Sequence, residues 1–349
     1  MKEIVDSIGE KRTLSLEELK AIAVCNDENE IDYLYSAARN TANKYYGSKV
    51  YIRGLIEFTN RCKNDCYYCG LRASNKNIHR YRLSEDDILR CCKNGYFLGF
   101  RTFVLQGGED PSISDEDYIR LIRRIKTAYP DCALTLSIGE KSRKSYESMF
   151  KAGANRYLLR HETADKNHYG RLHPPNMSFE NRMRCIRDLK QIGYQTGVGF
   201  MVGSPYQTID NIYQDLCFIR ELSPEMVGIG PFIPHKDTPF GEKAQGPLEL
   251  TLKLISIIRL LLPSVLLPAT TALGSIAPNG RERGILAGAN VVMPNLTPIE
   301  RREDYSLYNN KLSVGAESAE GLAELKAKIS QLGYTVVSDR GDFIPADNA

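Results

Sequence analysis

Short runs of β-branched and other apolar residues alternate along this chain with longer stretches whose apolar positions recur every three or four residues. The short runs read, in order, VYIRGLIEF, TFVLQ, ALTLSI, RYLLR, TGVGFMV, MVGIGPF, LLPATT and NVVMP. Longer stretches such as SEDDILRCCKNGYFLGF and DEDYIRLIRRIKTAY have the period of amphipathic helices. Eight strand–helix units in about 250 residues are typical of a closed parallel barrel. The pattern therefore predicts an α/β fold, a (β/α)8 TIM-type barrel, with an open doubly wound sheet as the alternative.

The same pattern divides the chain into three parts. Residues 1–48 are predicted to form an N-terminal helical extension, in which Ser15 and Glu18 have the spacing of a capping box. Residues 49–310 contain the eight units and are predicted to be the barrel. Residues 311–349 are predicted to form a short C-terminal α/β extension that packs on it.

Composition narrows the possible function classes. The 349 residues carry 46 basic and 43 acidic side chains, a net charge of +3 that is too balanced to favour nucleic acid or an anionic membrane as a partner. The most apolar run, LKLISIIRLLLPSVLLPA, is interrupted by Arg259 and Pro263 and is too short to span a bilayer. No apolar signal segment opens the sequence. We therefore expect a cytoplasmic protein whose nine cysteines stay reduced.

Polar loops follow the predicted strands and indicate where chemistry takes place. After the first strand comes a cysteine-rich segment, and the later strands are followed by GGEDP, GE, HET, GSPYQT, PFIPH, ALGS and NLTP. In a barrel the carboxyl ends of all strands meet on one face, which is where active sites form. We expect the functional site at that face.

The segment EFTNRCKNDCYYCGL places three thiols close together, at Cys62, Cys66 and Cys69. A structural zinc site needs four ligands, and no second cysteine pair is present. A redox CxxC formed by Cys66 and Cys69 would leave Cys62 without a role. Three thiolates can hold three irons of a 4Fe–4S cluster and leave the fourth iron open to another ligand. The incomplete set therefore favours an iron–sulfur cluster that takes part in chemistry, and the six scattered cysteines are interpreted as small buried hydrophobes.

The CxxxCxxC spacing with Tyr68 before the last cysteine resembles the signature of the radical S-adenosylmethionine (SAM) enzymes. That resemblance implies that the open iron binds SAM, which is cleaved to methionine and a 5′-deoxyadenosyl radical. The segment QGGED, with Gly107, Gly108 and Glu109, is similar to the family's segment that receives the methionine amino group. The segment VGFMVGSPYQT, which contains Met201, is similar to the strand end that lies against the adenine.

Longer motifs narrow the resemblance within that superfamily. YLLRHETA, SFENR, MVGIGPFIPH, PATTALG and GANVVMPNLTP together resemble the HydE family, radical enzymes that help to mature iron–iron hydrogenases. Biotin synthase and methylornithine synthase are related by overall pattern, but LSIGE and GVGFMVG lack the cysteines with which biotin synthase binds a second cluster. By resemblance, Glu162 and Arg182 hold the methionine end of SAM. The implied substrate residues are Arg156, Arg160, Thr270, Thr271, Met293 and Tyr305.

The resemblance also implies the cofactors and partners. We expect SAM and a single 4Fe–4S cluster bound by three cysteines, because no cysteine follows Cys217. The implied substrate is a cysteine-derived small molecule, taken in the family to be an iron–carbonyl–cyanide complex. The reductant would be a ferredoxin or a flavodoxin, and other hydrogenase maturases would be transient partners. Two alternatives stay open: a methylornithine synthase-like enzyme acting on a small amino-acid-like substrate, and a non-catalytic iron–sulfur scaffold.

Overall fold

A parallel sheet of six strands forms most of a barrel wall in the computed structural model, which describes residues 1–345. In order around the wall these strands are β2 (Gly54–Thr59), β3 (Thr102–Gly107), β4 (Ala133–Ser137), β5 (Arg156–Leu158), β6 (Gln195–Val198) and β8 (Met226–Val227). Each neighbouring pair is parallel and in continuous register, apart from one irregularity in β2 between Glu57 and Thr59.

Isolated bridges close the wall into a ring. Met226 pairs with Leu266, Pro268 pairs with Val291 in β10 (Val291–Val292), and Asn295 pairs with Leu55 in β2. Residues 266–268 and 291–295 thus occupy the seventh and eighth strand positions. The predicted eight-stranded barrel is confirmed, and the open doubly wound sheet is excluded.

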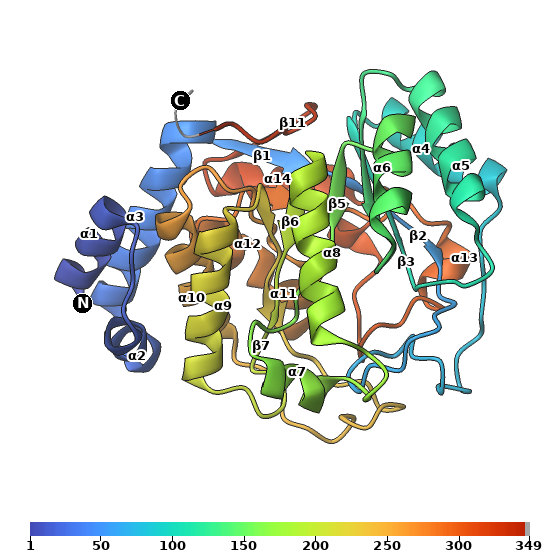
Figure 1. The fold of residues 1–349 in the computed structure, drawn as a ribbon. Helices are drawn as coiled ribbons and strands as arrows, with labels where there is room; N and C mark the ends of the chain where they lie inside the picture. Colours follow the sequence, from blue (N-terminus) through green and yellow to red (C-terminus); the bar gives the residue numbers. More distant parts are fainter. Residues whose placement is uncertain (346–349) are drawn as a thin grey trace.

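Helices cover the outside of the barrel (Figure 1). They are α4 (Glu85–Phe97), α5 (Asp115–Ala128), α6 (Arg143–Ala152), α8 (Phe179–Ile192), α9 (Ile209–Leu222), α10 (Leu248–Leu261) and α12 (Gly280–Leu286). Other helices lie in the connections: α7 (Lys166–Leu172), α11 (Thr271–Ile276) and α13 (Ile299–Arg302). Capping boxes at Ser84, Ser114 and Thr208 fix the starts of α4, α5 and α9, because each side chain accepts a hydrogen bond from the third helical residue.

Three N-terminal helices pack beside the barrel, at the left of Figure 1. They are α1 (Lys2–Lys11), α2 (Leu16–Val24) and α3 (Glu28–Tyr46). The predicted capping box is present, since Ser15 and Glu18 exchange side-chain and backbone hydrogen bonds. Helix α10 lies between these helices and the wall and is buried from Thr251 to Leu261, which explains why it is apolar on all sides. Within residues 1–345, no helix combines the length and apolar character needed to cross a membrane.

The amino ends of the strands are covered by the C-terminal part of the chain. The first predicted run splits at Arg53 into β1 (Lys49–Ile52) and β2. Strand β1 pairs in parallel with β10 and with β11 (Thr335–Val337). Before β11 come a 3-10 turn (Gly315–Glu317) and α14 (Leu322–Gln331). The domain boundaries at 48/49 and 310/311 stay predictions.

At the opposite end of the barrel, two strands continue past a glycine. β7 (Met201–Val202) extends β6 beyond Gly199, and β9 (Gly230–Pro231) extends β8 beyond Gly228. A Cβ atom on Gly199 would lie 1.9 Å from the Gly228 carbonyl oxygen, so this close approach of two backbones requires glycine.

Candidate functional site

The three clustered cysteines lie on the loop after β2, and neighbouring loops hold it in place. Lys63 N–H donates to the Glu109 carbonyl oxygen at 3.0 Å, and Arg72 forms a two-pronged ion pair with Asp65 at 2.8 and 2.7 Å. A Cβ atom on Gly108 would lie 2.3 Å from the Arg61 carbonyl oxygen and 2.7 Å from Cys62 Cβ. Gly108 therefore lets the end of β3 approach the cysteine loop closely.

The three thiols are free, partly buried and close enough to influence one another. Burial, together with the neighbouring thiols, raises the pKa of Cys66 and raises that of Cys69 to about 12. A metal centre is needed to remove these protons at neutral pH. Within residues 1–345 no three such side chains converge tightly enough to hold a single ion. A 4Fe–4S cluster binds each thiolate at a separate iron, and the three thiols fit that larger group.

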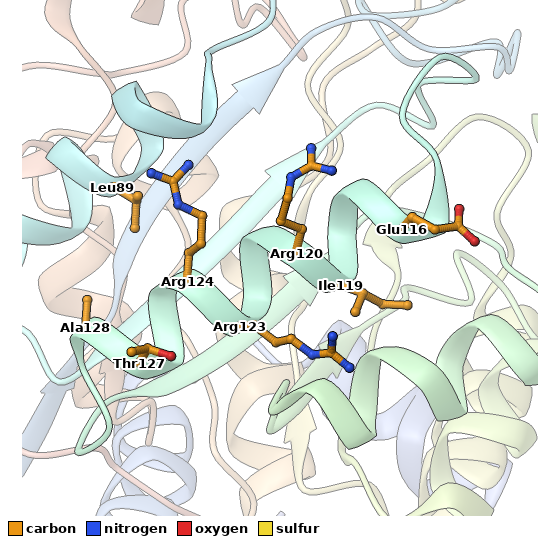
Figure 2. A pocket seen from close by; sticks show the side chains of 8 residues that line it. All are labelled: Leu89, Glu116, Ile119, Arg120, Arg123, Arg124, Thr127 and Ala128. Atoms are coloured by element: carbon orange, nitrogen blue, oxygen red, sulfur yellow. The ribbon is translucent and has the colours of Figure 1, made fainter.

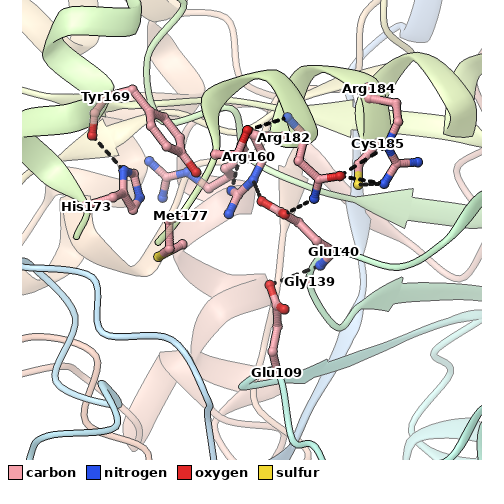
Figure 3. A network of polar contacts seen from close by, with 12 residues as sticks. Glu109, Gly139, Glu140, Arg160, Tyr169, His173, Met177, Arg182, Arg184 and Cys185 are labelled. Atoms are coloured by element: carbon pink, nitrogen blue, oxygen red, sulfur yellow. Dashed lines mark hydrogen bonds and ion pairs between the residues drawn. The ribbon is translucent and has the colours of Figure 1, made fainter. Parts of the chain in front are cut away.

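Glu109 ties the β3 loop to its neighbours through its side chain. Its Oε1 accepts from the Glu140 backbone N–H at 3.0 Å, and its Oε2 lies 3.3 Å from Lys63 Nζ (Figure 3). Gly139, at φ +81°, leaves room for this carboxylate, because a Cβ there would lie 2.1 Å from Glu109 Cγ. The side chain of Glu109 thus joins neighbouring loops, and the Gly108 backbone is held by its N–H to the Thr59 carbonyl oxygen at 3.1 Å and by its carbonyl oxygen to the Asp110 N–H at 2.9 Å.

Arg182 projects from α8 toward the strand ends and is held by Glu140. Its Nε donates to Glu140 Oε1 at 2.6 Å, and its Nη1 donates to the Arg160 carbonyl oxygen at 2.6 Å (Figure 3). The residue is 7% exposed. Its position fits a carboxylate-binding role, since neither bond uses Nη2. Sequence reasoning did not assign Glu140, although the GE of LSIGE is one of the converging loops.

Glu162, which is buried, and Arg160, which is partly exposed, form an ion pair with unused hydrogen-bonding capacity. Arg160 Nη2 lies 3.5 Å from Glu162 Oε2, and neither atom has a hydrogen-bond partner within the described residues; Arg160 Nε lacks one as well. Glu162 also adopts φ +63°, a left-handed conformation that a glutamate rarely takes. Buried polar groups without partners are costly. A ligand carrying an ammonium and a carboxylate would satisfy both side chains.

A histidine–aspartate pair fixes the backbone beside Glu162. His161 Nδ1 accepts from the Gly199 N–H at 3.3 Å, so its proton is on Nε2, which lies 3.3 Å from Asp215 Oδ1. Both side chains are fully buried. Glu162 itself donates its backbone N–H to the Gly199 carbonyl oxygen at 3.0 Å. Sequence reasoning missed this pair, because Asp215 lies on α9 and only the fold brings it to the HET loop.

A packed apolar cluster lies next to the last cysteine. Leu172, Met201, Phe232 and Phe240 pack with Tyr68, whose hydroxyl lies 3.1 Å from His173 Nε2. Burial lowers the pKa of His173 to about 3, so this imidazole is neutral. Because His173 Nδ1 donates to the Tyr169 carbonyl oxygen, Nε2 accepts from the Tyr68 hydroxyl. Aromatic and apolar side chains of this kind can pack against one face of a flat base such as adenine.

The expected substrate residues come from three places at the same end of the barrel. Thr270 precedes α11 and has a buried Oγ1 without a hydrogen-bond partner in the described residues, whereas Thr271 lies near Glu317. Tyr305 is 2% exposed and its hydroxyl accepts from Gln106 Nε2 at 3.4 Å. No direct bond among Arg160, Thr270 and Tyr305 is present within residues 1–345.

Two further side chains near Tyr305 were missed. Lys311 Nζ lies 2.6 Å from Glu57 Oε1 and 5.2 Å from the centre of the Tyr305 ring. The lysine side chain is 8% exposed and the glutamate 0%. Glu57 is an acidic residue inside β2, which could have indicated a buried basic partner. Nothing in the sequence identifies that partner as Lys311.

Two predicted substrate residues lie elsewhere. Met293 packs on an apolar cluster that contains Tyr51, Met226 and Leu266. Arg156 is the first residue of β5. Arg160 comes four residues later along extended chain, about 13 Å away, toward the carboxyl end of the barrel.

The prediction for Arg156 is corrected by its contacts. Its guanidinium is fully buried and donates to the carbonyl oxygens of Arg340 and Gly341 and, at 2.7 Å, to Asp342 Oδ1. All its nitrogens are engaged, since Nε donates to Gln195 and Nη1 to Thr102. Arg156 therefore secures the C-terminal segment rather than a substrate.

A surface groove of about 610 Å³ lies on the outer face of α4 and α5, away from the strand ends (Figure 2). Arg120 and Arg124 line it, and both are paired with Glu85. Arg123 also lines it. No thiol or unsatisfied buried polar group faces this groove within the described residues, so we do not assign it a catalytic role.

Comparison with known proteins agrees with this geometry. Residues 56–219 match the family model described as the Radical SAM superfamily. The chain is 45% identical over 313 residues to the FeFe hydrogenase maturase subunit HydE of Thermotoga maritima, covering 90% of this chain and 89% of that protein. It is 31% identical over 316 residues to 3-methylornithine synthase of Methanosarcina acetivorans, covering 89% of each. The crystal structure of methylornithine synthase superposes with a TM-score of 0.84 at 26% identity, over 96% of this chain and 97% of that one.

Proposed function

This chain belongs to the radical SAM superfamily as a HydE-like radical SAM maturase, and from that premise we propose that it cleaves SAM at a 4Fe–4S cluster held by Cys62, Cys66 and Cys69. The radical that results would act on a cysteine-derived small molecule. The cluster and SAM, when bound together, supply the reductive carbon–sulfur cleavage that yields methionine and a 5′-deoxyadenosyl radical.

The observation that carries this proposal is the unsatisfied Glu162 Oε2 beside the three-thiol loop, together with the Arg182 guanidinium, whose Nη2 makes no hydrogen bond within the described residues. A buried carboxylate without a hydrogen-bond partner attracts an ammonium group, and a guanidinium attracts a carboxylate. The amino-acid end of SAM carries both groups. Arg182, held by Glu140, would bind the methionine carboxylate, while Glu162 would bind the amino group together with the Gly107–Gly108 backbone. Tyr68 and Met201 would contact the adenine.

The remaining polar groups at this end of the barrel are proposed to bind the substrate. Arg160 provides a planar fork for an anion, and the hydroxyls of Thr270, Thr271 and Tyr305 can donate to its other lone pairs. The relative from Thermotoga maritima is named as a hydrogenase maturase. We therefore propose a sulfur-bearing, cysteine-derived substrate, including an iron–carbonyl–cyanide–cysteine complex, on the path to the two-iron unit of an iron–iron hydrogenase.

The same relatives favour one alternative substrate class. A 31% identical relative is named 3-methylornithine synthase, and a solved structure of that enzyme has the same fold. A small amino acid would also fit a site built from a guanidinium and hydroxyls. Incubation with each class of substrate, followed by mass spectrometry, separates the two: deuterium from a labelled amino acid in 5′-deoxyadenosine favours the alternative.

We propose a ferredoxin or a flavodoxin as reductant, other hydrogenase maturases as transient partners, and the cytoplasm as the place of action. A reducing compartment suits a chain whose cysteines are all free within the described structure.

The first prediction tests SAM cleavage directly. Protein reconstituted with iron and sulfide under anaerobic conditions, reduced with dithionite and given SAM, should release 5′-deoxyadenosine. Replacing Cys62, Cys66 or Cys69 with Ala should abolish the product and the iron–sulfur absorbance, because each thiolate holds its own iron. Cys92→Ala is the matched control, since Cys92 is buried in α4 within the apolar core.

Two results would contradict the proposal. Wild-type protein that carries the cluster but releases no 5′-deoxyadenosine would favour the non-catalytic scaffold. Retention of the cluster spectrum in Cys66→Ala would show that the ligands were wrongly assigned.

A further inference from the structure

A second surface groove borders the cysteine loop itself. It has a volume of about 480 Å³ and is lined by Tyr67, Arg171, Tyr206, Pro239, Phe240 and Lys243. We call it the loop groove. Helix α7, which carries Arg171, lies in Figure 1 at the lower end of the barrel, together with the loops that follow the strands.

The backbone of the thiol loop connects the loop groove to the proposed cluster ligands. Tyr67 directly follows Cys66, and its N–H donates to the Leu172 carbonyl oxygen at 3.0 Å. The Phe240 N–H donates to the Tyr67 carbonyl oxygen at 3.3 Å, and the two rings meet edge to face at 5.9 Å. One wall of the groove is therefore the thiol loop, so a molecule seated there lies next to the metal ligands.

Two cations in the loop groove have aromatic but no acidic partners. The Arg171 guanidinium lies 3.6 Å from the centre of the Tyr206 ring, and Lys243 Nζ lies 5.3 Å from it. Neither residue forms an ion pair within residues 1–345. Glu242 is the neighbouring acidic residue in the chain and is exposed, as Lys243 is. Cations and aromatic rings without bound carboxylates are typical of surfaces that recognise an acidic partner.

Tyr206 is held in a strained and exposed position. Its φ is +70° and 45% of the residue is exposed, although it is a large aromatic. Gln207 braces the turn, because its side chain accepts from the Gly203 N–H at 2.7 Å and donates to the Met201 carbonyl oxygen at 2.9 Å. Backbone strain at a non-glycine residue is costly and is concentrated at functional sites. Here it presents a ring to solvent between two cations.

We propose that the loop groove is the docking site for a small acidic protein that carries a one-electron redox group. This inference rests on the proposed function, which requires an external electron. The donor is oxidised by one electron and the iron–sulfur centre is reduced by one, with no atom transferred. Electron-transfer encounters are small, below about 1,200 Å² of buried surface, so a local groove flanked by two cations suits such a brief contact. Positive charge at the contact would attract the acidic donor and raise its rate of association.

The test measures binding separately from chemistry. Oxidised flavodoxin is titrated into the anaerobically reconstituted protein at low ionic strength, and the dissociation constant is followed by flavin fluorescence. The double variant Arg171→Glu, Lys243→Glu should bind at least about tenfold more weakly, and its affinity should depend less on salt. Arg123→Glu, in the groove of Figure 2, is the matched control and should bind as wild type does.

A kinetic readout separates docking from catalysis. With reduced flavodoxin as donor, 5′-deoxyadenosine formation should fall at least about tenfold in the double variant. With dithionite, which needs no docking surface, the rate should equal that of wild type. If wild type forms no product with dithionite, the proposed function is wrong. The flavodoxin affinities alone would then test the loop groove. Equal flavodoxin affinity in wild type and the double variant, or equal weakening by Arg123→Glu, would overturn the loop groove as the docking site.

Discussion

Glu162 combines two features that the surrounding structure must hold in place. It has a left-handed backbone and a buried Oε2 without a hydrogen-bond partner in the described residues. The neighbouring His161, fixed by Gly199 N–H and by Asp215, keeps that backbone in position. A carboxylate held this rigidly loses little entropy when a ligand binds, which makes it a selective group for an ammonium.

Glu162→Gln should weaken SAM binding without changing the cluster. The variant keeps the size of the side chain and loses its negative charge, so the affinity should fall by roughly 1.5–3 kcal/mol, as for a hydrogen bond to a charged group. Equilibrium dialysis with labelled SAM measures the loss, and the visible spectrum checks the cluster. Glu180→Gln is the control, because Glu180 is 62% exposed and pairs only with Lys166 and Ser178 at the surface. Equal affinity in Glu162→Gln and wild type would refute the assignment.

At the scale of elements, the C-terminal segment and the first residue of β5 depend on each other. Asp342 accepts from the fully buried Arg156 and from Gln195, and Arg156 lowers the pKa of Asp342 although burial raises it. Removing Asp342 leaves the buried guanidinium with its carbonyl partners but without this counter-charge, which is costly.

Asp342→Ala should therefore lower the free energy of unfolding by about 1–3 kcal/mol, measured by urea denaturation. SAM cleavage should be unaffected, because the contact lies at the amino ends of the strands. Asp86→Ala, which removes an ion pair from an 80% exposed aspartate, should change stability by less than about 0.5 kcal/mol. If Asp342→Ala is as stable as wild type but forms no product, that result would support the predicted substrate role of Arg156 instead.

The elements that the sequence predicted well are those with a strong local pattern. The capping box of Ser15 and Glu18 and the 3.6-residue period of α4 and α5 are local features, as is the thiol spacing. Three strand runs were predicted as single strands but are interrupted, at Arg53, Gly199 and Gly228. At the glycines the cause is the approach of two backbones, which depends on the partner strand. For the same reason the Lys311–Glu57 and His161–Asp215 contacts could not be predicted, because each joins two different elements.

At the scale of the molecule, the positions of the nine cysteines support one cluster. Cys91, Cys92, Cys132 and Cys185 are buried, and Cys25 and Cys217 lie apart from the thiol loop. Reconstituted protein should therefore contain about four irons per chain. Cys66→Ala should remove all of them, and Cys185→Ala none. An iron content of about eight, measured by colorimetric assay and by Mössbauer spectroscopy, would show a second cluster.

Pairing of β11 with β1 also determines when the fold can be completed during synthesis. The partners, residues 335–337 and 49–52, come from nearly opposite ends of the chain. During translation every barrel strand leaves the ribosome before the segment that covers the Arg156 guanidinium. Until that segment is synthesised, the guanidinium stays hydrated and the amino end of the barrel stays exposed to solvent. Completion therefore waits for residues 335–342, and a chain released before them by a premature stop codon would present an unsealed barrel to proteases and chaperones.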